Sequence, residues 1–182
     1  MADENGGLIA AETARRFGFT DSTLARLVQR GRIERTARGV FRIPFMNPGP
    51  LAQYLEAVMW AKAHSGPQQV AISHVSALAV FGISDANPAS IHLTVPKKAR
   101  LRRETPRNIV LHHGDLPPES ITIHEGIPVT TVPQTVFDLQ MAGIRVDLIR
   151  QAVADARKEG FIDEATARHL RRRIEKISKL QS

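Results

Sequence analysis

The chain has 182 residues, no cysteine and a formal net charge of +7. Without cysteine it has neither disulfides nor cysteine-ligated zinc, and no apolar run approaches the roughly 20 residues of a membrane-spanning helix. The first residues, MADENGGLIA, lack the basic start and apolar stretch of a signal peptide, so we expect a cytoplasmic protein. The excess of positive charge favours a polyanionic partner, either nucleic acid or an anionic membrane surface.

The first predicted elements are two short helices separated by a turn. A helix is predicted over residues 10–17, because apolar side chains recur there at spacings of four and three. Gly18 ends this helix, since glycine tolerates the positive φ that is common at a helix end. Thr20 is a suitable cap for a second helix that runs to about Arg30.

The spacing of Ala14, Gly18, Leu24 and Leu27 is typical of a helix-turn-helix. Such a motif needs a small residue where the helices meet and a turn glycine four residues later. It also needs apolar residues six and nine positions after that glycine, which hold the second helix against the first. The sequence therefore predicts a helix-turn-helix at the start of the chain.

The second helix has an apolar side and a polar side on a helical wheel. Leu24, Leu27 and Val28 share one face, which leaves the opposite face free to enter a major groove. Arginine can bridge O6 and N7 of guanine, and glutamine can pair with N6 and N7 of adenine. An ordinary solvated face is the alternative. The residues predicted to read bases are Ser22, Arg26, Gln29 and Arg30.

An arginine-rich hairpin is predicted directly after this helix. Strands over 33–37 and 40–43 flank the turn Arg38-Gly39, whose glycine would let the tip approach a nucleic-acid backbone closely. The wing of a winged helix places guanidinium groups on phosphates or in a minor groove. Helix and hairpin are therefore expected to form one cationic surface shaped for duplex DNA. The residues predicted to hold the wing on DNA are Arg32, Arg35, Arg38 and Arg42.

The whole chain is predicted to be an α+β protein of two domains. Residues 1–46 form the winged helix-turn-helix, the proline-rich stretch 47–50 is a linker, and residues 51–182 form an α+β domain with a small mixed sheet and several helices. Winged helices usually have three helices, and few residues precede the first predicted helix here. Either that extra helix is missing, or the second domain covers the face that it would cover.

The elements predicted for the second domain alternate between helices and strands. The predicted elements are a helix over 51–64, a strand over 69–73, a helix over 75–81, strands over 91–95, 108–112 and 121–129, and helices over 133–141, about 148–156 and from Asp163 onward.

Several motifs resemble the AbiEi-type antitoxins of bacterial type IV (abortive-infection) toxin–antitoxin systems. The stretch GFTDSTLARLVQRGRIERTARGVFRIP resembles the winged helix-turn-helix of that family. The stretches SHVSAL (73–78), GISDANPASIHLTVP (82–96) and GIPVTTVPQTVFDL (126–139) are similar to parts of its second domain, so the resemblance covers about residues 7–162.

The resemblance implies a transcriptional autorepressor that binds repeats upstream of its own operon. It also implies functional pairing with a nucleotidyltransferase-like toxin, without a stable complex between the two proteins, and no cofactor. Recognition of an inverted repeat would favour two copies of the chain on DNA.

Polar residues of the second domain leave enzymatic alternatives open. Ser73 and His74 could act as nucleophile and base with Asp138 as the orienting carboxylate, although Ser73 also suits the cap of the following helix. A second option is a metal held by three histidines on different predicted strands. These are His92, His112 and His124.

A metal-dependent nuclease would need clustered acids and a lysine, whereas the acids of this domain are scattered along the sequence. We therefore expect no enzyme and no metal site, with a nuclease or an RNA-binding protein as the alternatives. The predicted winged region lacks the stacking aromatics typical of single-strand binding. Thr135 and Asp138 share a helical face, and we expect a local cap or an internal hydrogen bond that fixes this helix on the sheet, with a toxin-facing or effector-facing role as the alternative.

Two further basic stretches are candidates for contacts with nucleic acid. The helix over 168–179 could contact DNA, a partner protein or a second copy of the chain. Membrane binding is not expected, because its apolar ridge lacks Trp and Phe. The loop over 96–107 supplies the predicted accessory contacts, which are Lys97, Lys98, Arg100, Arg102 and Arg103.

Overall fold

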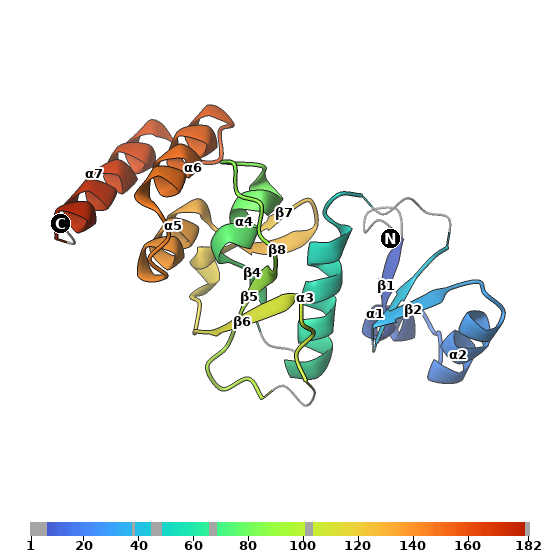
Figure 1. Cartoon of the computed structure of the whole chain (residues 1–182). Coiled ribbons are helices and arrows are strands. Elements are labelled where there is room, and N and C mark those ends of the chain that lie inside the picture. Colours follow the sequence, from blue (N-terminus) through green and yellow to red (C-terminus); the bar gives the residue numbers. More distant parts are fainter. Residues whose placement is uncertain (1–6, 38, 45–48, 66–68, 101–103, 181–182) are drawn as a thin grey trace.

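The computed structural model describes residues 7–37, 39–44, 49–65, 69–100 and 104–180. The chain is α+β, as predicted, with one sheet of three strands and one of five (Figure 1). Arg38, Arg102 and Arg103 lie outside the described residues, as does part of the predicted linker.

The N-terminal part contains two helices and an antiparallel sheet in the order β1-β3-β2. Strand β1 was not predicted. It pairs Leu8 with Arg42 and Ala10 with Val40, so the first helix begins one residue later than expected. Three residues are too few to show a periodicity. The elements are β1 (Leu8–Ala10), α1 (Ala11–Arg16), α2 (Asp21–Gln29), β2 (Glu34–Ala37) and β3 (Val40–Arg42).

Helix α3 (Ala52–Ser65) connects the two sheets. It contacts β1, β2 and β3 on one side and strands of the second sheet on the other, and it lies between the sheets in Figure 1. Because α3 covers the small sheet, no additional N-terminal helix is needed there. The division into two domains at residues 47–50 remains a prediction.

The second sheet is mixed and has the order β6-β5-β4-β8-β7. Strands β5 and β6 are parallel, as are β4 and β8, while β4–β5 and β7–β8 are antiparallel. The single strand predicted over 121–129 is a hairpin, because Glu125 and Gly126 both adopt positive φ. The strands are β4 (Ala71–Ile72), β5 (Ile91–Val95), β6 (Ile109–His113), β7 (Ile121–His124) and β8 (Ile127–Thr130).

Four helices complete the fold, and three of them gather at the end of the molecule farthest from α2 (Figure 1). The predicted cap of the last helix is confirmed, since the Thr166 N–H donates to Asp163 Oδ1 over 2.8 Å. No described helix is long and apolar enough to cross a membrane. The helices are α4 (His74–Phe81), α5 (Val132–Met141), α6 (Val146–Lys158) and α7 (Glu164–Leu180), with a 3-10 turn at Pro118–Ser120.

Candidate nucleic-acid interface

Helix α2 buries one side and exposes the other. Leu24 is 3% exposed and belongs to a hydrophobic cluster with Ile33 and Phe41, so the helix packs on the small sheet. The predicted cap is confirmed, because the Thr23 N–H donates to Thr20 Oγ1 over 3.2 Å. The four residues predicted to read bases are all exposed on the outward side: Ser22, Arg26, Gln29 and Arg30.

The outward side of α2 carries unbalanced positive charge. Asp21, in the first turn, is already paired with Arg15, whose Nε lies 3.1 Å from Asp21 Oδ1. Arg26 and Arg30 make no ion pair within the described residues. Arg26 and Arg30 could therefore bind an anionic partner without first breaking an ion pair within the described residues.

The arginines of the hairpin differ in how available they are. Arg32 and Arg35 are exposed, and the Arg35 guanidinium lies 5.4 Å from the centre of the Phe41 ring. Arg42 is paired, because its Nη2 lies 2.9 Å from Glu34 Oε2 on the neighbouring strand. The remaining predicted wing residue, Arg38, lies outside the described residues.

Gly39, in the turn of the hairpin, contacts other elements of the chain. A Cβ at Gly39 would lie 3.6 Å from the Cβ of Ala63 on α3, and the Ala11 N–H donates to the Gly39 carbonyl over 2.8 Å. One side of this glycine therefore faces α3, and its close approach to a DNA backbone remains a prediction. The cationic surface consists of the outward side of α2, the α2–β2 connection at Arg32, and Arg35.

The loop after β5 exposes Lys97, Lys98 and Arg100. The Lys97 N–H donates to Asp115 Oδ1 over 3.1 Å, which ties the start of the loop to the end of β6. The side chains of these three basic residues are exposed to solvent. Their accessory role remains a prediction.

The Ser73–His74 pair is not completed by Asp138. Ser73 Oγ lies 2.9 Å from His74 Nδ1 and accepts a hydrogen bond from Thr94 Oγ1 over 2.8 Å. This buried side chain makes no cap hydrogen bond, contrary to its predicted role. Asp138 instead accepts from Gln134 Nε2 over 2.8 Å, and burial raises the pKa of its carboxyl. Among the described residues, no carboxylate forms a hydrogen bond with the His74 imidazole.

Three histidines do gather, but not the three that were predicted. His92 Nδ1 lies 2.9 Å from His112 Nε2, and the ring of His74 stacks on that of His112 with centroids 3.6 Å apart. His124 packs instead against Phe81 and Phe161. Within the described residues, no group of histidine and acidic side chains has an arrangement that could hold a metal ion.

The histidine cluster is uncharged near neutral pH. Burial, followed by repulsion from His112 and His92, lowers the pKa of His74 from 6.5 to about 3. Burial also lowers the pKa of His92 and of His112. His74 has φ 53, a backbone conformation that is uncommon outside glycine. Sequence reasoning missed this trio, because His74 begins a helix whereas the other two lie on strands.

Thr135 has a structural role. Its Oγ1 donates to the Thr130 carbonyl over 3.1 Å and lies 2.8 Å from Thr130 Oγ1, and both side chains are buried. These bonds fix the start of α5 on β8. The expected internal hydrogen bond that fixes this helix on the sheet is thus confirmed for Thr135, whereas Asp138 bonds within α5 to Gln134.

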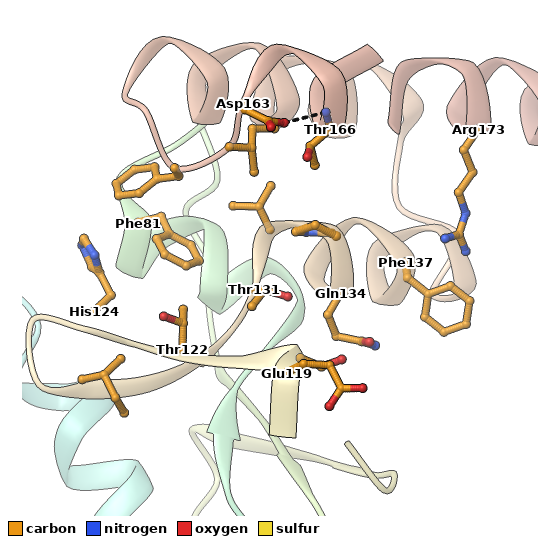
Figure 2. A pocket seen from close by; sticks show the side chains of 16 residues that line it. Phe81, Glu119, Thr122, His124, Thr131, Gln134, Phe137, Asp163, Thr166 and Arg173 are labelled. Carbon is orange, nitrogen blue, oxygen red and sulfur yellow. Dashed lines mark hydrogen bonds between the residues drawn. The ribbon is translucent and has the colours of Figure 1, made fainter. Parts of the chain in front are cut away.

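A groove of about 930 Å³ runs between β7, α5 and α7. Figure 2 shows its two walls, with Asp163, Thr166 and Arg173 above and Thr122 below. At one end the Arg173 guanidinium lies 4.9 Å from the centre of the Phe137 ring. The groove was not predicted, because its lining comes from segments that are far apart in the sequence.

Comparison with known families bears on the helix-turn-helix. Residues 2–44 match the family described as "Transcriptional regulator, AbiEi antitoxin". This match confirms the predicted resemblance over the segment that contains α1, α2 and the hairpin. Over these residues the chain is thus similar to an AbiEi-type transcriptional regulator.

The whole chain was also compared with curated proteins and with solved structures. A comparison with curated proteins finds no match. Among solved structures, three chains match. One of them is the RV2827C protein from Mycobacterium tuberculosis, which is 15% identical with a TM-score of 0.47, over 90% of this chain and 65% of that chain. The present chain thus spans about two thirds of the length of that protein.

Proposed function

We propose that this protein is a sequence-specific repressor that binds double-stranded DNA upstream of its own operon. It acts by binding and not by catalysis, without a cofactor, in the cytoplasm. As the AbiEi-like antitoxin of a type IV system, it is paired in function with a nucleotidyltransferase-like toxin without a stable complex. An inverted repeat in the operator would bind two copies.

The observation that carries this proposal is the outward side of α2. Arg26 and Arg30 are exposed and free of carboxylates within the part of the chain that is described, while the opposite side of the helix is held in the core. A helix supported in this way can enter the major groove, which is about 12 Å wide. In that position Arg26 would reach a guanine edge.

Contacts with phosphates come from the residues beside α2. Arg32 and Arg35 are exposed and do not depend on the end of the hairpin. Each phosphate that they neutralise should add about 0.9 to the slope of log affinity against log salt. The loop with Lys97, Lys98 and Arg100 would supply accessory contacts with flanking DNA.

Footprinting on the DNA upstream of the protein's own gene tests the proposal. We expect a protected site whose binding is lost with Arg26→Ala and retained with Arg145→Ala, which removes an exposed arginine on another face. Absence of any protected site would reject the repressor. Competition with double-stranded RNA of the same sequence, and incubation of plasmid DNA with Mg²⁺, would reveal an RNA-binding protein or a nuclease instead.

A further inference from the structure

The arginines of α7 occupy three different sides of the helix. The Nη1 of Arg171 lies 3.4 Å from Glu164 Oε1 at the start of the same helix, a carboxylate that also pairs with Arg157 of α6. Arg173 faces α5 and lies over the Phe137 ring. These cations are engaged within the fold.

A third group of cations points away from the protein. At about 100° per residue, Arg172 lies on the side opposite the buried Leu170 and Ile174. Arg168 and Lys176 stand one turn to either side of it, so the three form a ridge at positions i, i+4 and i+8. All three are exposed. We define them as the α7 ridge.

The α7 ridge is not neutralised internally. None of its three side chains makes an ion pair within the described residues. Glu175 flanks the ridge, and it too is exposed and unpaired in the described structure. Like charges four residues apart destabilise a helix slightly, so the ridge contributes nothing to folding that would explain its charge.

The spacing of the ridge suits a phosphate backbone. Eight residues of helix extend about 12 Å, with a cation about every 6 Å, and duplex DNA carries one negative charge per roughly 1.7 Å of its axis. The ridge has no Phe, Tyr or Trp that could stack on an unpaired base or enter a lipid surface. Its charge is therefore complementary to a duplex.

The ridge cannot belong to the interface formed by α2. The two helices lie at opposite ends of the molecule, with α3 and both sheets between them (Figure 1). We propose that the α7 ridge is a second duplex-binding surface, which grips phosphates without reading sequence and lets one chain hold two segments of DNA. The inference rests on the proposed function, in which α2 holds the first segment.

A capture experiment tests the second surface directly. The upstream duplex is fixed to beads, the full-length protein is bound, and a labelled duplex of unrelated sequence is added. The ridge variant carries Arg168→Ala, Arg172→Ala and Lys176→Ala. The matched control carries Arg145→Ala, Arg150→Ala and Lys158→Ala, which removes the same residue types and the same charge from exposed positions elsewhere.

We expect the wild type and the control to capture the labelled duplex, and the ridge variant to lose capture at least tenfold while it still occupies the bead-bound DNA. Capture by the ridge variant equal to that by the control would overturn the inference. That result would mean that two copies of the protein associate and that each copy holds one duplex through its own α2. Stronger capture of double-stranded RNA than of DNA would overturn it as well.

A salt titration separates this inference from the proposed function. Binding of unrelated duplex is measured in solution, where no operator is needed. Loss of all three contacts should lower the salt slope by up to about 2.7 relative to the control. If the wild type does not bind the upstream DNA but the ridge substitutions still lower the salt slope, the proposed repressor function is rejected and the second duplex-binding surface is supported. If the slope of log affinity against log salt is equal for the ridge variant and the control, the second duplex-binding surface is rejected and the proposed repressor function is unaffected. Matching circular dichroism spectra would show that both variants are folded.

Discussion

The guanidinium of Arg42 lies 2.9 Å from the carboxylate of Glu34, across the two strands of the hairpin. The two residues are directly opposite in the β2–β3 register. Half of the Glu34 side chain is exposed, so this is a surface ion pair, which typically contributes no more than about 1 kcal/mol to stability. Its main effect is on binding, because it withholds one arginine from an anionic partner.

Replacing Glu34 with Gln should therefore strengthen binding to DNA. The variant frees Arg42 for a phosphate, and the slope of log affinity against log salt should steepen by about 0.9. Fluorescence anisotropy over a range of salt concentrations measures both quantities. An unchanged slope would mean that the hairpin does not face the duplex. Glu159→Gln, at an exposed position outside both proposed DNA-binding surfaces, is the control for loss of a negative charge elsewhere.

Arg26→Ala should weaken binding to the specific site by about 1–3 kcal/mol, because a guanidinium that bridges two acceptors of guanine is lost. Binding to unrelated duplex should change much less. The ratio of the two affinities, measured for Arg26→Ala and for the control Arg145→Ala, is the decisive quantity. Equal losses on both duplexes would assign Arg26 to a phosphate and not to a base.

Gly39→Ala should lower the free energy of unfolding by about 1–2 kcal/mol. The cost comes from φ 77, which an L side chain adopts only with strain. The distance of 3.6 Å to Ala63 is an ordinary contact and adds little. Urea denaturation measures the change. Gly49→Ala, at a glycine with open space and without positive φ, should show no comparable loss.

Acid should destabilise the fold through the histidine cluster. The folded-state pKa of His74 is about 3, below its ordinary 6.5, so the unfolded chain binds the additional proton first. Stability is therefore full above about pH 6.5 and falls as the pH drops toward 3, by up to about 1.4 kcal/mol per pH unit for this group. His92 and His112 act in the same direction.

The variant His74→Asn should flatten this dependence. Asparagine tolerates the positive φ of this position better than most residues and does not titrate. Chemical denaturation at a series of pH values from 7 to 4 compares the two proteins. If the wild type and the variant lose stability with the same slope, the histidine cluster is not the source of the acid sensitivity.

Local patterns were enough to predict helix α2 and its orientation. Thr20 caps the helix, and the spacing of Leu24 and Leu27 identifies the buried side. Both signals lie within about three turns of chain, where helix periodicity alone determines which residues share a face. The exposed positions of Arg26 and Arg30 follow from the same periodicity. Local periodicity also predicted most strands of the second sheet and most of the helices that pack around it.

Contacts between distant segments could be decided only by the tertiary structure. Strand β1 exists because β3 offers it a partner, and Gly39 faces Ala63 because α3 packs on the small sheet. His74 joins His92 and His112 only where the start of α4 meets two parallel strands. Side-chain periodicity shows which way a residue points, but the packing of one element on another determines what it meets there.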